Sequence, residues 1–173
     1  WMITKEEFTR VLTNPDWYIQ GSIYTIVDGK DSKVNETYKS YAEYLSNLPT
    51  LINNKTVFKI QDLEKFNNAI VKKCSQLFEI WKKPVNCHAY WGYADTKSFD
   101  KHTDPCEVCI YICEGIKQID LDQKQSIIRE GQHLYIKANE PHAAKNLTDC
   151  LSLSFGTEDF TETYCETGMD ISL

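Results

Sequence analysis

The sequence predicts a mainly β domain with flanking helices, in which a sandwich or barrel of short strands follows a helical N-terminal half. Apolar residues of the first half recur at helical spacing, whereas the second half alternates short β-rich segments with turn residues. The 173 residues are enough for one domain with a single sizeable core. A hydrophobic content of 42% and an aromatic content of 12% indicate a folded chain rather than a disordered one.

We expect this single domain to have three parts. Residues 1–84 are expected to give helical and strand support, residues 85–156 the β core, and residues 157–173 an acidic tail. The tail contains no Lys or Arg, and its acidic residues are Glu158, Asp159, Glu162, Glu166 and Asp170. No segment of the sequence has the character of a linker between two domains.

The N-terminal part is expected to hold three helices and one strand. Thr4 and Glu7 have the spacing of a capping box, and Asn14-Pro15 is expected to end the helix that follows. Residues 18–27 have the composition of a strand. Two longer apolar stripes, with Pro49 and Pro84 as the expected helix ends, are Tyr38, Tyr41, Ala42, Leu45 and Leu48, and Leu63, Phe66, Ile70, Leu77, Phe78 and Trp81.

The second half contains six candidate strands. They are residues 85–93, 106–114, 117–121, 125–129, 132–137 and 150–155. Turn residues such as Gly115, Gly131 and Pro141 separate them. Many short strands at this close spacing are typical of a β sandwich or barrel.

The charge and cysteine content exclude several classes of partner. A net charge of −6 and an isoelectric point of about 5.2 leave no basic footprint for nucleic-acid binding. No apolar run reaches the roughly 18 residues of a membrane span, so we expect no membrane insertion. The seven cysteines are odd in number and lack a framework spacing, and no signal peptide is visible. We therefore expect free thiols and a cytoplasmic protein.

His102, Asp104 and His142 form the most informative pattern of the chain. Two imidazoles and one carboxylate are the three-point ligand set of non-heme Fe(II) oxygenases, which leaves positions open for a co-substrate and oxygen. His102 and Asp104 are two residues apart, so an extended backbone would direct both side chains to one side. His142 must approach from a different strand. The spacing permits this metal site, although a His-x-Asp pair also arises by chance.

The context of these three residues resembles the Jumonji-C-like cupin oxygenases, a family that includes asparagine, lysine and ribosomal-protein hydroxylases. Residues 99–117 carry a His-x-Asp-Pro motif, a hydrophobic segment and a Gly-x-Lys motif. Residues 131–142 are similar to the family's Gly-Asp-x-Leu-Tyr-Ile-Pro segment that leads to the second metal His, and residues 151–155 are similar to its closing strand. The resemblance covers roughly residues 85–156 and implies a double-stranded β-helix, the jelly-roll barrel of cupins.

This resemblance implies an Fe(II)- and 2-oxoglutarate-dependent oxygenase that hydroxylates a C–H bond. It assigns His102, Asp104 and His142 as iron ligands. Lys117, fifteen residues beyond the first metal His, would bind the distal carboxylate of 2-oxoglutarate. The resemblance also gives Tyr90 and Ser154 a place as hydrogen-bond partners of this co-substrate. The prime substrate would be a small molecule or a peptide, and neither its identity nor the oligomeric state can be read from the sequence.

Several residues depart from the family pattern and keep other functions open. Gln132 and Lys137 replace a usual Asp and Pro, His88 stands where Asn is frequent, and Phe99 replaces a Thr that in some members binds the co-substrate. One alternative is a metal-dependent cupin dioxygenase or isomerase that does not use 2-oxoglutarate. Another is a non-catalytic cupin that binds a ligand. Cys106-x-x-Cys109 could be read as a zinc motif, but on a strand the two thiols would face opposite sides.

Overall fold

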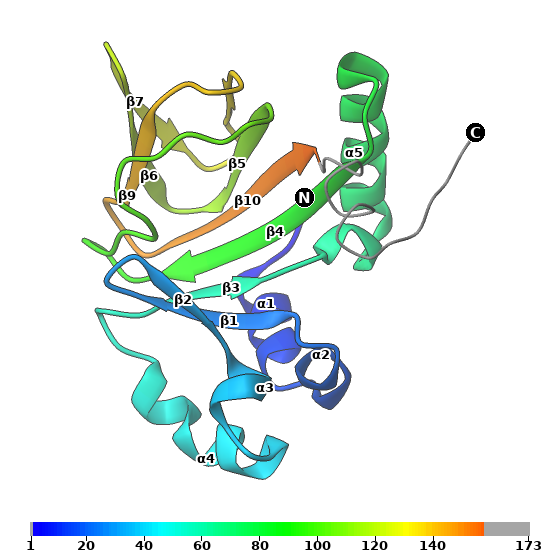
Figure 1. Cartoon of the computed structure of the whole chain (residues 1–173), viewed down its shortest axis with the longest axis vertical. Helices are drawn as coiled ribbons and strands as arrows, with labels where there is room; N and C mark the ends of the chain where they lie inside the picture. The colour runs from blue at the N-terminus through cyan, green and yellow to red at the C-terminus, as the bar shows by residue number, and fades with distance from the viewer. Residues whose placement is uncertain (1, 158–173) are drawn as a thin grey trace.

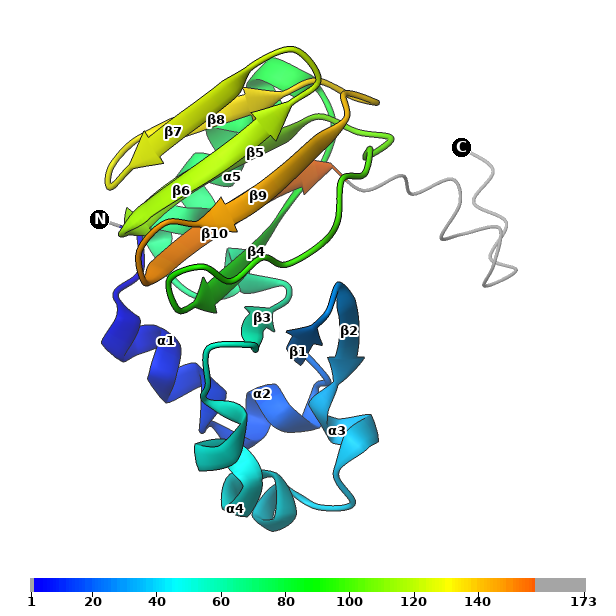
Figure 2. The same ribbon diagram turned by 90° about the vertical axis from the view of Figure 1, so that its left-hand side faces the viewer.

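The computed structural model describes residues 2–157, except for the side chain of Lys65. Two antiparallel sheets face each other, and helices cover the outer face of the larger sheet (Figures 1 and 2). The larger sheet has seven strands in the order β2-β1-β3-β4-β10-β5-β8, and the smaller sheet has three in the order β7-β6-β9. The fold class predicted from the sequence, mainly β with a cupin-like jelly roll, is confirmed.

The helical elements lie almost entirely in the first half of the chain. They are α1 (Lys5–Leu12), α2 (Pro15–Ile19), α3 (Val34–Thr37), α4 (Tyr41–Leu51), the 3-10 turn η1 (Leu63–Lys65) and α5 (Asn68–Trp81). The strands are β1 (Ile23–Val27), β2 (Lys30–Lys33), β3 (Val57–Ile60), β4 (Val85–Gly92), β5 (Val108–Glu114), β6 (Ile116–Leu121), β7 (Gln125–Arg129), β8 (His133–Ile136), β9 (His142–Asn146) and β10 (Cys150–Thr157). Within residues 2–157, no helix has the length and apolar character needed to cross a membrane.

The predicted start and end of the first helix are confirmed, whereas the helix end predicted at Pro49 is wrong. Thr4 and Glu7 form a complete capping box, each side chain accepting from the other residue's backbone N–H. Pro15 ends α1 and also begins α2, because proline fits the first helical position, where no N–H is needed. Pro49 lies inside the last turn of α4, which continues to Leu51. One helical hydrogen bond is lost there, but Ile52 still donates to Leu48 and closes the turn.

The N-terminal strands continue the large sheet of the core. β1 pairs with β2 and β3, and β3 pairs antiparallel with β4, so the division expected near residue 85 is not a break in the sheet. Of the predicted strand at 18–27, only residues 23–27 are extended. The expected end of the core at residue 156 is one residue short, since β10 includes Thr157. The acidic tail lies outside the described residues.

Alternation along β4 and β10 divides the large sheet into two different faces. The odd-numbered residues of both strands are buried against the helices in the main apolar core, together with Phe8, Leu63, Ile70 and Leu77. These odd-numbered residues are Cys87, Ala89, Trp91, Leu151, Leu153 and Phe155. A second cluster, which includes Ile112, Ile119 and Ile128, fills part of the space between the two sheets. The remaining face of β4 and β10 is polar and lines a cavity.

Candidate metal centre and cavity

His102 and His142 face each other across an isolated antiparallel bridge. His102 lies in the loop between β4 and β5, and His142 is the first residue of β9. The His102 N–H donates to the His142 carbonyl at 3.0 Å, and the His142 N–H donates back to the His102 carbonyl at 2.9 Å. Directly paired residues of this kind project to the same face, which places the two ring centroids 4.5 Å apart. The extended backbone expected at His102 thus forms one isolated bridge and not a strand.

Asp104 completes a cluster of three potential metal ligands. Its backbone carbonyl accepts a hydrogen bond from the Asn139 N–H at 2.7 Å, which ties the loop to the turn before β9. Its Oδ2 lies 3.2 Å from Nε2 of His142 and 3.8 Å from Nε2 of His102. One ligand atom from each of the three residues lies within 4.8 Å of the other two. Among residues 2–157, no comparable group includes Cys106 or Cys109.

The second nitrogen of each imidazole is held by a backbone carbonyl. Nδ1 of His102 lies 2.8 Å from the Asp100 carbonyl oxygen, and Nδ1 of His142 lies 2.9 Å from the Glu140 carbonyl oxygen. A carbonyl oxygen can only accept, so each Nδ1 carries a hydrogen and Nε2 is the atom directed at Asp104. Metal-binding histidines are oriented in this way, with one nitrogen fixed by an acceptor and the other available to the ion.

The electrostatics of the cluster follow from the close approach of His142 and Asp104. The hydrogen bond from His142 lowers the pKa of the Asp104 carboxyl, and the charges of the two histidines act in the same direction. The same hydrogen bond raises the pKa of His142 above its usual value, although burial of the ring opposes this. The cluster therefore favours an ionised carboxylate, and a cation bound here would take the place of the His142 proton.

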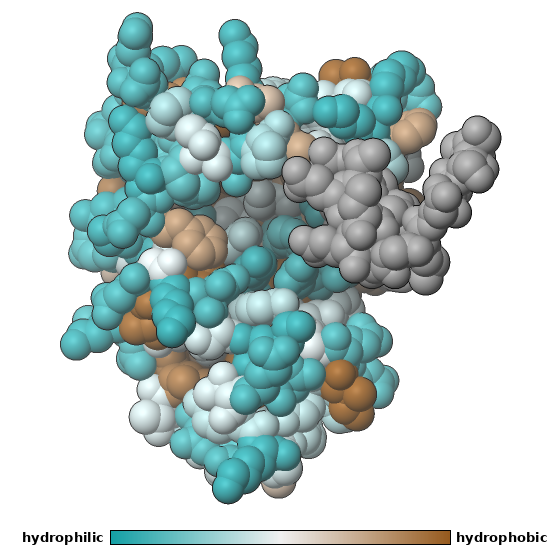
Figure 3. All heavy atoms as spheres, viewed as in Figure 1, coloured by the Kyte–Doolittle hydropathy of each residue, from teal (hydrophilic) through white to brown (hydrophobic). Residues whose placement is uncertain are grey.

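The three residues open into a cavity of about 700 Å³ between the two sheets. Its wall includes the even-numbered residues of β4 and β10, which lie opposite one another in the pairs Tyr90–Ser152, His88–Ser154 and Asn86–Gly156. Figure 3 shows this face as spheres, with a hollow between the barrel and the N-terminal strands, surrounded mainly by hydrophilic side chains.

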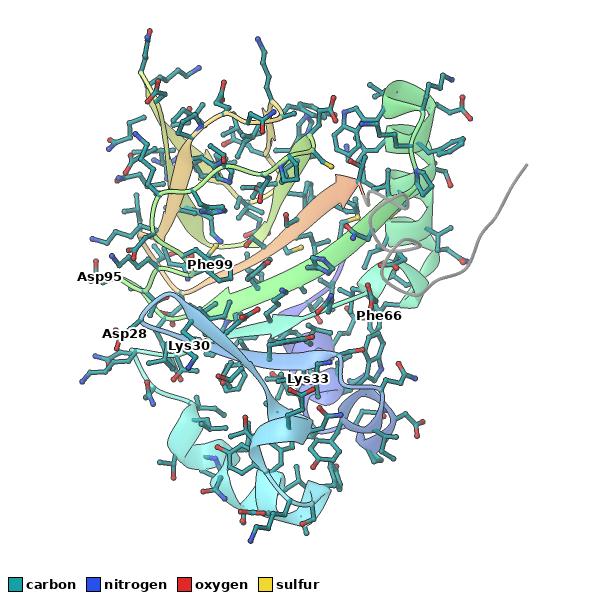
Figure 4. The ribbon with its side chains drawn as sticks, viewed as in Figure 1. Asp28, Lys30, Lys33, Phe66, Asp95 and Phe99 are labelled. Carbon is teal, nitrogen blue, oxygen red and sulfur yellow. The ribbon has the colours of Figure 1, made fainter. Side chains whose placement is uncertain are left out.

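The loop that carries His102 forms part of the cavity rim. Phe99 and Gly29 both line the cavity, Gly29 from the turn between β1 and β2. In Figure 4, Phe99 lies above the hairpin that bears Asp28 and Lys30. The Phe99 ring meets the His102 imidazole edge-on, with centroids 5.8 Å apart. An apolar ring thus stands beside the three potential metal ligands.

Lys117 is the most deeply buried cation of this cavity. It lies on β6 with 5% of its surface exposed, and its Nζ donates to Oγ of Ser152 at 2.6 Å. Within residues 2–157, it makes no ion pair with an Asp or Glu. Burial lowers the pKa of Lys117 for this reason, because desolvation of the ammonium is not offset by a carboxylate. A buried lysine without a counter-charge is suited to an anionic ligand.

The structure brings Tyr90, Lys117 and Ser154 to the same cavity as the three potential ligands. Their binding role remains a prediction. Burial raises the pKa of Tyr90, so its phenol stays a hydrogen-bond donor at neutral pH. The sequence reading missed Ser152, which is the hydrogen-bond partner of Lys117. The only available signal was the alternation of β10, which puts Ser152 on the same face as Ser154.

Comparisons with known proteins identify the fold. No protein-family model and no curated protein sequence matches this chain. A structure of YcfD, a ribosomal oxygenase from Escherichia coli, covers 100% of the chain with a TM-score of 0.66 and 14% identity. A second YcfD structure, in complex with cobalt and succinic acid, has a TM-score of 0.64 and 11% identity. The chain spans 51% of that enzyme, about half its length. At such identities the likeness shows the fold alone.

Proposed function

We propose that this protein is an Fe(II)- and 2-oxoglutarate-dependent oxygenase that hydroxylates a prime substrate. The observation that carries the proposal is the presence of two complementary sites in one cavity. One is the cluster of His102, Asp104 and His142, whose ligand atoms converge. The other is the ammonium of Lys117, which is buried and has no carboxylate partner within residues 2–157. Iron and the keto-acid end of a dicarboxylate suit the first, and the far carboxylate suits the second.

The ligand cluster fits a divalent metal in donor type and spacing. Donors about 2.1 Å from one ion, in the perpendicular arrangement of a three-point face, lie about 3 Å from one another. The Asp104 carboxylate is 3.2 Å from His142 Nε2 and 3.8 Å from His102 Nε2, and all three ligand atoms lie within 4.8 Å of one another, so the side chains would move closer together around a shared ion. Two neutral imidazoles and one carboxylate on one face are the ligand set of non-heme Fe(II) oxygenases. Since both imidazoles must be neutral, with Nε2 free of a proton, to bind the metal, acid pH is expected to release it.

The part of the cavity around Lys117 fits the distal carboxylate of 2-oxoglutarate. A carboxylate there would receive the charged hydrogen bond of the Lys117 ammonium and could share the Ser152 hydroxyl. Tyr90, the cross-strand partner of Ser152, offers a further phenol donor. The YcfD structure in complex with cobalt and succinic acid supports this choice, because a metal and a dicarboxylate accompany a similar fold there.

The protein residues have three tasks in this reaction. Iron, 2-oxoglutarate and oxygen together supply an oxidant for an unactivated C–H bond, with 2-oxoglutarate, O₂ and the substrate giving succinate, CO₂ and the hydroxylated product. His102, Asp104 and His142 would hold the metal. Lys117 neutralises and orients the dicarboxylate. The walls of the cavity exclude bulk water and position the target carbon.

Succinate formation gives a direct test. Purified protein with Fe(II), 2-oxoglutarate and ascorbate is expected to form succinate slowly even without a prime substrate, and His102→Ala or Asp104→Ala should abolish it. His133→Ala and Asp122→Ala are matched controls, because His133 is exposed on β8 and Asp122 lies in the β6–β7 turn, outside the cavity. Metal binding without 2-oxoglutarate consumption would instead favour a cupin dioxygenase or isomerase of another kind.

A further inference from the structure

The cavity contains a second buried lysine that the reaction described above does not use. Lys59 lies on β3, where it is the cross-strand partner of Tyr90 on β4. Tyr90 in turn pairs with Ser152 on β10, so Lys59, Tyr90 and Ser152 form one row on the cavity face of the sheet. Neighbouring strands are about 4.8 Å apart, which separates the backbones of Lys59 and Ser152 by about 10 Å. Lys59 therefore belongs to a different part of the cavity wall from Lys117 and Ser152.

The charge of Lys59 is partly compensated. Its side chain is 13% exposed, and it forms an ion pair with Asp31, whose Oδ2 lies 3.8 Å from the ammonium. The Asp31 side chain is itself 44% exposed and thus largely solvated. The ammonium also lies 5.0 Å from the centre of the Tyr24 ring. Burial lowers the pKa of Lys59, although Asp31 and, less strongly, Asp62 act in the opposite direction, so an anionic ligand would offset desolvation that these carboxylates do not.

His88 adds a neutral donor to the same wall. It lies two residues before Tyr90 on β4, so it shares the cavity face, and it lines the cavity. Its Nδ1 accepts the backbone N–H of Asp62 at 3.2 Å, which leaves the ring hydrogen on Nε2. Burial, and secondarily the charge of Lys59, lowers the pKa of His88 to about 4. Its cross-strand partner Ser154 contributes a hydroxyl.

We propose that Lys59 and His88 form a subsite for an oxyanion, a carboxylate or phosphate group carried by the prime substrate. A buried ammonium, an imidazole N–H and a hydroxyl are all donors, and an oxyanion is the ligand group that accepts from all three. That the oxyanion belongs to a prime substrate rests on the proposed oxygenase function, whereas binding of an oxyanion at this wall does not. The net charge of −6 alone would favour a basic substrate, but local charges in a cavity decide recognition.

The test uses the full chain with the metal and 2-oxoglutarate sites already occupied. Zn(II) and N-oxalylglycine, an unreactive analogue of 2-oxoglutarate, fill the first two sites, and inorganic phosphate or acetate is then titrated in separate arms. Nitrogen-15 NMR follows the His88 ring and the amides of β3 and β4. We expect saturable shifts there, and at least tenfold weaker binding in Lys59→Met. Lys59→Arg should stay within about threefold of wild type.

Lys33→Met is the matched control for this experiment. Lys33 lies 5.7 Å from the same Tyr24 ring but does not line the cavity, so its loss should leave anion binding unchanged. Equal binding in wild type and Lys59→Met, shifts confined to Lys117 and Ser152, or no saturable shift in either arm would overturn the subsite. Lys59-dependent binding without succinate formation would retain the subsite and refute the oxygenase proposal. Succinate formation without Lys59-dependent binding would do the reverse.

Discussion

The two faces of β4 and β10 consist of the same two strands and have opposite chemistry. The face toward the helices is apolar and sealed, with Cys87, Leu153 and Phe155 each 0% exposed. The face toward the small sheet carries His88, Tyr90, Ser152 and Ser154, which line the cavity. Because side chains alternate along a strand, neighbouring residues of β4 and β10 serve different purposes: one packs in the core and the next lines the cavity. On these two strands, loss of an odd-numbered residue should therefore affect folding, and loss of an even-numbered residue should affect ligand binding.

The largest effect is expected on the sealed face. Phe155→Ala removes a fully buried ring from the main core and should lower the free energy of unfolding by about 3–5 kcal/mol. The neighbouring Ser154→Ala, on the cavity face, should change it by less than about 1 kcal/mol. Urea unfolding followed by circular dichroism measures both. Similar losses in the two variants would show that the faces are not functionally distinct.

On the cavity side, Lys117→Met should separate binding from stability. Methionine fills much of the same volume without a charge, so removing a buried ammonium that has no counter-charge should leave the stability unchanged or raise it. The loss of the charged hydrogen bond should weaken 2-oxoglutarate binding by about 2 kcal/mol, roughly thirtyfold. Calorimetry with Zn(II)-loaded protein measures this affinity. Unchanged 2-oxoglutarate binding together with retained metal would remove Lys117 from the site.

The pH dependence of stability tests the burial of His88. Its folded-state pKa of about 4 lies below the ordinary value of 6.5, so the unfolded chain takes up the proton first as the pH falls. Stability is therefore full above about pH 6.5 and declines toward pH 4. Between pH 7 and pH 5, the metal-free wild type should lose about 2 kcal/mol more than His88→Asn, which cannot titrate. Parallel urea midpoints for the two proteins over this range would contradict the burial of the ring.

The smallest effect is expected at Tyr90. Tyr90→Phe removes one neutral phenol donor from the row that includes Ser152 and should weaken 2-oxoglutarate binding about fivefold, or about 1 kcal/mol. The apolar ring remains, so the unfolding free energy should change little. The same calorimetric titration provides the measurement. A thirtyfold loss would mean that the Tyr90 phenol contributes as much to 2-oxoglutarate affinity as the Lys117 ammonium, which would contradict this prediction.

Local patterns in the sequence were sufficient for much of the fold. The capping box at Thr4 and Glu7 and the strands around residues 85–92 and 150–157 follow from local rules, and the structure confirms them. Three strands were missed, and of these only β3, Val-Phe-Lys-Ile, consists mainly of strand-forming residues. β2 and β9 are polar or rich in Ala, and β3 has only four residues. Each becomes extended because a neighbouring strand supplies its hydrogen bonds, which no local propensity encodes.

The site could be predicted only where residue chemistry was unusual. His102, Asp104 and His142 were named because a metal needs those donors, and the structure brings them together. Their assembly depends on one isolated bridge between His102 and His142, which the local sequence does not encode. Lys59 and Ser152 were not named, because a lysine or serine on a strand carries no signal until the register places it at a cavity.

An anaerobic titration tests most directly whether iron and 2-oxoglutarate bind together in this cavity. Fe(II)-loaded protein is mixed with 2-oxoglutarate without oxygen, and the visible charge-transfer absorption of an iron–keto-acid chelate is recorded. We expect a saturable band in the wild type, a band that needs much more 2-oxoglutarate in Lys117→Met, and none in Asp104→Ala. Iron that binds to the wild type without producing this band, or a band that persists unchanged in Asp104→Ala, would contradict this expectation.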